Sequence, residues 1–128
     1  MRKSSVDFDT VRDIGLALPG VEESTAYGAP ALKLHGQLLA CIPSHRSAEP
    51  GSLAVRVDFD ARAELLAAAP DIYYLPDHYV DYNAVLVRLP RIDRGVLKDL
   101  LGMAYKFVAG KVASRSSARK HRKTRPRR

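Results

Sequence analysis

The chain has 128 residues, of which 46% are hydrophobic and 27% charged, so it can form one domain with an apolar core but is too short for two domains of typical size. No apolar run approaches the roughly 20 residues of a transmembrane helix, and the N-terminus lacks the apolar segment of a secretory signal, so we expect a cytoplasmic protein. The single cysteine, Cys41, excludes an internal disulfide and argues against structural zinc.

The net charge of +7 is concentrated at the C-terminal end. Residues 1–110 hold 12 Lys and Arg against 14 Asp and Glu, a balance of −2, whereas residues 111–128 hold nine cations and no acid. The last segment is rich in Ser, Arg and Lys and cannot bury enough surface to fold alone. We therefore predict a folded domain over residues 1–111 and a disordered basic tail over residues 112–128.

The first half of the chain is predicted to form one helix followed by three strands. Asp7 or Asp9 can cap the helix, whose apolar residues recur at helical spacing until Pro19-Gly20 ends it. A linker then leads to Ala31. Alternation of apolar residues predicts strands at residues 31–35, 38–42 and 53–57, the first two of them forming a hairpin and the last two joined by a mobile loop.

The second half begins with a predicted helix over residues 60–69. A short extended segment at 72–75 and a turn-rich connector at 76–81 lead to a clear strand at 82–89. Asp93 is expected to cap the longest helix, which has a wide apolar stripe and should end at about Lys111. The order α-β-β-β-α-β-β-α, with hairpins or short connections, predicts an α+β fold of two layers: a mainly antiparallel sheet with helices on one face.

A two-layer fold leaves one sheet face free of helices, and the period of two along a strand predicts which side chains point there. Lys33, His35, Arg56, Leu86 and Arg88 are expected on that face. The four strand segments contain no carboxylate, so the three cations would make the face positive. Single cations are, however, also ordinary on a solvated sheet face.

No pattern in the sequence predicts catalysis. Asp77, His78 and Asp81 could be read as metal ligands or an acid–base pair, but no spacing recruits a further ligand, and turn formation explains them better. Cys41 lies near the pair Ser44-His45, but neighbours in a flexible loop do not make a catalytic triad. We expect a non-enzymatic protein with no cofactor and no metal.

Four tyrosines, Tyr73, Tyr74, Tyr79 and Tyr82, lie within ten residues of one another. Stacking on unpaired bases, worth about 1–3 kcal/mol per base, is one use for such a cluster. Aromatic residues near a sheet edge more often close the core, and we favour that interpretation.

Several motifs resemble those of the MmcQ/YjbR-like family. They are Leu18–Glu23 (LPGVEE), Tyr27–Gly36 (YGAPALKLHG), Leu53–Val57 (LAVRV) and Asp77–Tyr79 (DHY), and with the closing strand and helix they cover nearly all of residues 7–110. The resemblance implies a compact α+β domain with an antiparallel sheet. It also implies DNA binding, by similarity to a double-wing domain whose sheet and hairpin loops meet the duplex, with Lys33 and Arg56 as the cations that face DNA.

The sequence departs from the family at Tyr82, where many relatives have tryptophan; the chain contains no Trp. A related arrangement of helices and strands occurs in secretion chaperones, which bind protein partners. Because fold alone does not determine function, both kinds of partner stay open at this point.

We predict a monomeric, largely sequence-tolerant DNA-binding protein, with DNA favoured over RNA and no membrane contact. The expected contacts are the sheet cations and those of the tail: Lys33, Arg56, Arg88, Arg115, Arg119, Lys120, Arg122, Lys123, Arg125, Arg127 and Arg128. The alternative is a protein-interaction or chaperone-like module that uses the open sheet face or a strand edge.

Overall fold

The computed structural model describes residues 6–124, and it describes side chains as far as Ala113. In chain order its elements are α1 (Phe8–Leu16), β1 (Val21–Ala26), β2 (Ala29–Leu34), β3 (Gln37–Cys41), β4 (Ser52–Arg56), α2 (Phe59–Ala68), β5 (Tyr73–Tyr74), the 3-10 turn η1 (Asp77–Tyr79), β6 (Ala84–Arg88), the 3-10 turn η2 (Leu89–Arg91) and α3 (Arg94–Thr124). The strands form one antiparallel sheet in the order β1-β2-β3-β4-β6-β5. The predicted α+β class is confirmed.

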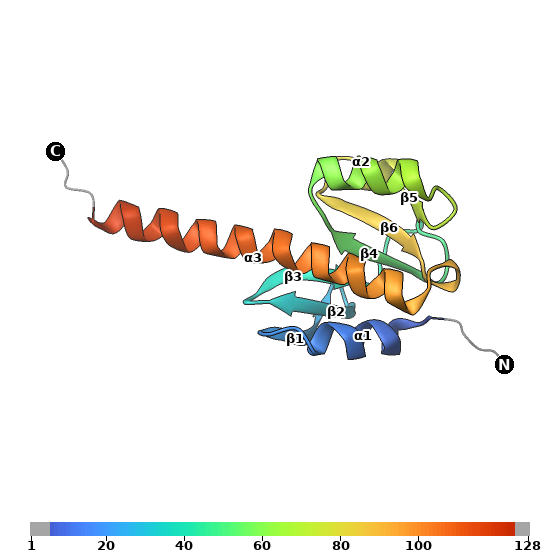
Figure 1. Ribbon diagram of the computed structural model, residues 1–128, viewed down its shortest axis with the longest axis horizontal. Coiled ribbons are helices and arrows are strands. Elements are labelled where there is room, and N and C mark those ends of the chain that lie inside the picture. Colours follow the sequence, from blue (N-terminus) through green and yellow to red (C-terminus); the bar gives the residue numbers. More distant parts are fainter. Residues whose placement is uncertain (1–5, 125–128) are drawn as a thin grey trace.

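Each helix begins after an aspartate that accepts a backbone N–H bond. Asp7 accepts from Thr10 at the start of α1, and Asp93 accepts from Val96 at the start of α3, as the sequence predicts. Asp58 does the same for α2, two residues before the predicted start. The three helices pack on one side of the sheet, with α3 between α1 and α2 (Figure 1).

The main core lies between these helices and the sheet. The alternating residues predicted to face the helices are all buried in it: Leu32, Leu34, Leu53, Val55, Val57, Val85, Val87 and Leu89. Leu97, Leu101, Ala104 and Val108 of α3 complete this cluster and are each fully buried. The apolar stripe of α3 therefore holds both halves of the sheet together.

Strand β1 occupies a segment that was expected to be a linker. Its residues pair with β2 in continuous register, from Val21 opposite Leu34 to Ala26 opposite Ala29. The connecting turn has Tyr27 at φ 54 and Gly28 at φ 79, the two positive values of a type I′ hairpin turn. Sequence alternation did not reveal β1 because it is an edge strand with only Val21 buried.

Helix α3 continues beyond the expected end at Lys111 and reaches Thr124. No glycine or proline occurs between Gly110 and Pro126, and the intervening Lys, Arg and Ala residues favour a helix once it has begun. The basic residues up to Lys123 thus stand on a helical backbone that projects past the sheet (Figure 1). Residues 125–128 of the predicted tail lie outside the described residues. Among the helices of residues 6–124, none is long and apolar enough to cross a membrane.

The contact between α1 and β2 leaves no room for a side chain at Gly15. A Cβ there would overlap Cδ1 of Leu32, which is fully buried. We expect Gly15→Ala to lower the free energy of unfolding by about 1–3 kcal/mol. The control is Gly102→Ala on α3, where nothing lies within 4 Å of the added Cβ; this change should raise stability by about 0.5–1 kcal/mol. Urea midpoints measure both, and equal midpoints would contradict the packing of α1 on β2.

Candidate nucleic-acid interface

The sheet face away from the helices is partly covered. A second, smaller core of Ala31, Cys41, Ala54 and Leu86 lies on this face beneath Tyr79. Leu86 was expected to be exposed, but it is fully buried. The prediction is wrong because strand periodicity gives the face of a residue and not which connecting segments cover it. Burial also raises the pKa of the Cys41 thiol.

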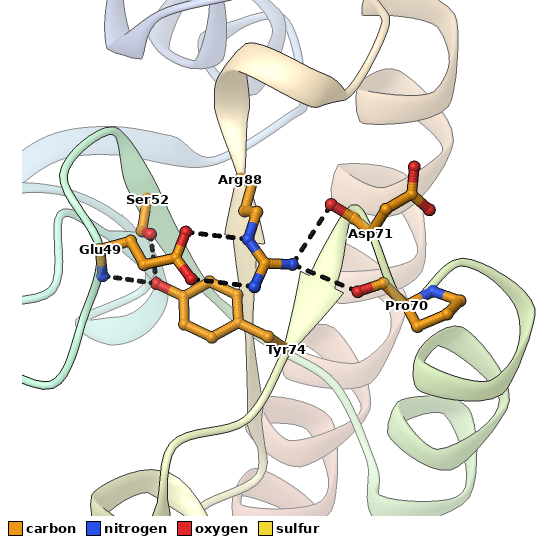
Figure 2. A network of polar contacts seen from close by, with 6 residues as sticks. All are labelled: Glu49, Ser52, Pro70, Asp71, Tyr74 and Arg88. Carbon is orange, nitrogen blue, oxygen red and sulfur yellow. Dashed lines mark hydrogen bonds and ion pairs between the residues drawn. The ribbon is translucent and has the colours of Figure 1, made fainter.

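Arg88 lies on this face and is held by bonds within the chain (Figure 2). Its Nε and Nη2 donate to the two carboxylate oxygens of Glu49, each at 2.9 Å. Its Nη1 donates to the carbonyls of Pro70 and Asp71, each at 3.2 Å. Four of the five guanidinium N–H groups are thus engaged, so Arg88 has only one left to offer an external phosphate.

The same network fixes the loop between β3 and β4. The Tyr74 hydroxyl accepts from the Glu49 N–H at 2.7 Å and shares a short hydrogen bond with Ser52 (Figure 2). The Arg88 guanidinium lies 4.3 Å from the centroid of the Tyr74 ring. The hydrogen bond from Arg88 lowers the pKa of Glu49. Glu49, Ser52, Tyr74 and Arg88 therefore connect the β3–β4 loop to strands β5 and β6, and we call these four side chains the clasp.

Lys33 lies on the sheet face away from the helices (the second face), as predicted. However, a carboxylate from β1 lies on the same surface. Its cross-strand partner on β1 is Glu22, and its partner on β3 is Leu38. Side chains directly opposite in an antiparallel pair have Cβ atoms only about 4.5–5.5 Å apart, so Glu22 places a negative charge beside Lys33. The expectation of a cationic sheet face overlooked Glu22 because β1 was not recognised as a strand.

Arg56, the last residue of β4, reaches the helix layer at the end of the sheet. Its guanidinium lies 5.6 Å from the centroid of the Phe107 ring on α3, and Nη1 donates to the Leu38 carbonyl at 3.4 Å. The Lys111 ammonium lies over the same ring, 5.1 Å from its centroid. Among the described side chains Arg12 and Arg88 pair with carboxylates, and Arg56 does not. Burial lowers the pKa of Arg56.

Arg62 on α2 comes to the same end of the sheet. Its Nη1 donates to the Tyr82 carbonyl at 2.7 Å and to the Ala84 carbonyl at 3.5 Å, and Ala84 is the cross-strand partner of Arg56. Its guanidinium lies 4.7 Å from the centroid of the Phe59 ring, which is 48% exposed. Like Arg56, Arg62 has an aromatic ring and carbonyls as partners and no carboxylate among the described side chains.

These side chains form the cationic end of the molecule, which we define as Arg56, Phe59, Arg62, Phe107 and Lys111. Two carboxylates, those of Asp58 and Asp60, lie nearby at the start of α2, and the first of them caps that helix. From Gly102 onward the sequence contains no Asp or Glu. The excess of cationic residues in the sequence therefore continues after Lys111.

The predicted contacts in the basic segment are only partly placed. Arg115, Arg119, Lys120, Arg122 and Lys123 belong to α3, but their side chains lie outside the described part of the structure. Arg125, Arg127 and Arg128 lie outside it altogether. Along a helical backbone the spacing of Lys111, Arg115, Arg119 and Arg122 is that of one helix face.

Sequence reasoning did not assign Arg62, Lys111 or the two phenylalanines to the interface. Two spacings in helices could have indicated them: Phe59 and Arg62 are three residues apart, and Phe107 and Lys111 are four apart. The approach of both pairs to Arg56 could not be foreseen, because it depends on how α2 and α3 meet the end of β4.

The structure also brings His45 and His78 together, which no spacing in the sequence predicted. Their rings stack with centroids 3.7 Å apart and planes inclined by 8°. Among the side chains that the structure describes, those of residues 6–113, no three His, Cys, Asp or Glu gather as a metal site would require.

The cationic end lies largely within a recognised family domain. A family model described as YjbR matches residues 16–107. The chain belongs to the YjbR family. This match includes Arg56, Arg62 and Phe107, whereas Lys111 and the basic part of α3 follow it.

A solved structure shows the same fold as this YjbR-family chain. It is the crystal structure of the Deinococcus radiodurans protein DR2400, with the family-model domain DUF419, at a TM-score of 0.66 and 21% sequence identity over 84% of this chain and 82% of that one. No curated protein matches the chain.

The clasp makes stability depend on pH. Because Arg88 lowers the pKa of Glu49, the pair stabilises the fold above the ordinary glutamate pKa of about 4.3, and this contribution is lost as pH falls through the lowered value. We expect Glu49→Gln to lower the melting temperature at pH 7, with the difference from wild type vanishing at low pH. Glu64→Gln, at an exposed carboxylate on α2, is the control and should change little at either pH. A Glu49→Gln deficit that stayed constant with pH would contradict the ion pair.

Proposed function

We propose that this YjbR-family protein binds DNA, contacting phosphates through the cationic end and the basic part of α3 without reading the base sequence. The observation that supports the proposal is the environment of Arg56. It is a half-buried arginine with no carboxylate partner among the described side chains, and it shares the Phe107 ring with Lys111 where α3 leaves the sheet.

A phosphate would supply the counter-charge that Arg56 lacks. The lowered pKa of Arg56 reflects the loss of solvent around a guanidinium that none of the described carboxylates compensates. Hydrogen bonds between an arginine and a phosphate are charge-assisted and often bidentate, so they favour this pairing. The Phe107 ring holds the guanidinium in place before the ligand arrives, at an interaction energy of about 0.5–1 kcal/mol for an exposed site.

Helix α3 extends this site with further cations. Lys111 begins a row at helical spacing that continues through Arg115, Arg119 and Arg122. Contacts of this kind release counterions from DNA and bind any sequence, because phosphates carry no direct sequence information. Lys33 and Arg88 are not part of the proposed surface, since Glu22 lies opposite one and Glu49 pairs with the other.

On this proposal the protein is a monomeric binding protein and not an enzyme. The cationic end consists of arginine, lysine and phenylalanine side chains, which supply positive charge and ring faces. An arginine stays protonated at all physiological pH values, so it acts as an electrostatic partner and not as a general base.

A second candidate function rests on the edge of the sheet. Strand β1 pairs with β2 alone in the described chain, and residues 22–25 are exposed. A peptide from another protein could add to this edge as a further strand, which is a recurrent mode of peptide recognition. Glu22, which is exposed on β1, would favour a basic peptide, whereas Glu23 already pairs with Arg12.

The cationic end is tested with the double variant Arg56→Gln/Lys111→Gln. We expect weaker binding to a labelled duplex in fluorescence anisotropy. The slope of log affinity against log salt should become less steep by about 2, since each phosphate contact contributes about 0.9. The control, Arg91→Gln/Lys98→Gln, removes the same charge where β6 ends and α3 begins, at the opposite end of the sheet. Equal effects of the two double variants would show that only net charge matters, and would contradict a defined interface.

The basic part of α3 is tested by ending the chain after Ala113, because Val112 is the last residue seen to pack against the core. This variant should keep its melting temperature and lose most of its DNA affinity. If it instead bound duplex as tightly as the full chain, the contribution of α3 would be refuted. The second candidate function would be supported by a different result. In that case neither form would bind DNA, the full chain would bind a basic peptide, and substitutions in β1 would abolish the peptide binding.

A further inference from the structure

Four aromatic side chains meet on the second face of the sheet, where the β3–β4 loop crosses the segment before β6. We call His45, His78, Tyr79 and Tyr82 the aromatic platform. His45 and His78 stack in parallel, and the Tyr79 ring stands edge-on to His78 with centroids 4.8 Å apart and planes at 82°. The Tyr82 ring lies 6.1 Å from His78 and 6.4 Å from Tyr79.

Only one of these rings is needed to close a core. Tyr79 packs on the second core, so the sequence-based preference for a core role is correct for this tyrosine. It is also correct for Tyr73, which is buried in the main core. Tyr82 is different, because it is 55% exposed, and His78 is exposed as well, whereas His45 is half-buried. The platform therefore presents more aromatic surface to solvent than the packing of the fold requires.

The His45 ring, on which His78 stacks, is held in place. Nδ1 of His45 lies 2.7 Å from the Ser47 hydroxyl and 3.1 Å from the Ser47 backbone nitrogen, which fixes the ring in the loop. Desolvation and the nearby His78 and Arg46 lower the pKa of His45, which favours the neutral form of the ring. Rings that are already ordered lose little conformational entropy when a ligand stacks on them.

The platform adjoins the cationic end. The backbone carbonyl of Tyr82 accepts the 2.7 Å hydrogen bond from Arg62, so these residues join the two regions. Asp77 and Asp81 flank the platform in sequence and disfavour phosphates beside the rings. A strand bound here would therefore place its phosphates at Arg62 and the rest of the cationic end, and its bases over the rings.

We propose that the aromatic platform stacks unpaired bases of a DNA strand whose phosphates lie on the cationic end. The inference rests on the proposed function and specifies its substrate class as single-stranded DNA. In a duplex the faces of the bases are covered by their neighbours, whereas an unpaired base offers a face to an aromatic ring. Such stacking tolerates any sequence because every base has a π face.

The test compares a thymidine strand with a strand of equal length that lacks bases, using the full chain and fluorescence anisotropy. Both strands offer the same phosphates, so the difference between them reports contacts with bases. We expect the wild-type protein to bind the thymidine strand at least about five-fold more tightly. Tyr82→Leu and His78→Leu should reduce this preference and leave affinity for the strand without bases unchanged. Tyr82→Phe, which keeps a ring, should retain it.

Tyr27→Leu is the matched control, because Tyr27 is 89% exposed at the β1–β2 turn and is not part of the platform. It should leave the preference intact. Equal affinity of the wild-type protein for the two strands would overturn the platform, while the proposed function would stand if Arg56→Gln/Lys111→Gln still weakened binding. Failure to bind any DNA would overturn both. Melting temperatures confirm that each variant is folded, and two independent variants keep the test valid if one of them is not.

Discussion

The antiparallel pairing of β4 with β6 is the constraint on which the rest of the structure depends. It sets Leu53 opposite Val87 and Val55 opposite Val85, and α3 covers these pairs. Burial of such side chains contributes about 1.5–3 kcal/mol each, which makes a change of register costly. The same register places Arg56 opposite Ala84, so the core determines where the cationic end is formed.

The arginines of this domain differ in the groups that contact their guanidinium. Arg88 lies between Glu49, two backbone carbonyls and the Tyr74 ring, and its charge is used to hold a loop. Arg56 and Arg62 have rings and carbonyls but no carboxylate among the described side chains. A guanidinium that is partly desolvated and not paired is poised to bind an anion, which is why the proposed interface lies at the end of the sheet and not on its face.

Much of the fold could be predicted from local patterns. The helix caps at Asp7 and Asp93 and the alternation in the central strands follow from short-range hydrogen bonding and periodicity. Strand β1 was missed because an edge strand buries too little to show a period, and the end of α3 was placed too early because charge composition was weighed above helix propensity. The failure to predict β1 had the larger effect on the predicted site, since β1 brings Glu22 opposite Lys33.

The sequence alone determined the two-layer α+β class, the resemblance to the YjbR family and the concentration of positive charge after residue 110. It also indicated Arg56 as a candidate DNA contact. Only the tertiary structure decided which cations are already paired, that Arg56 and Lys111 both lie over the Phe107 ring, and that His45 stacks on His78. The physical reason is the distance along the chain over which each effect acts. Helix caps and strand periodicity depend on residues a few positions apart. The pairing of a charge and the covering of a ring depend on residues far apart in the sequence that the fold brings together.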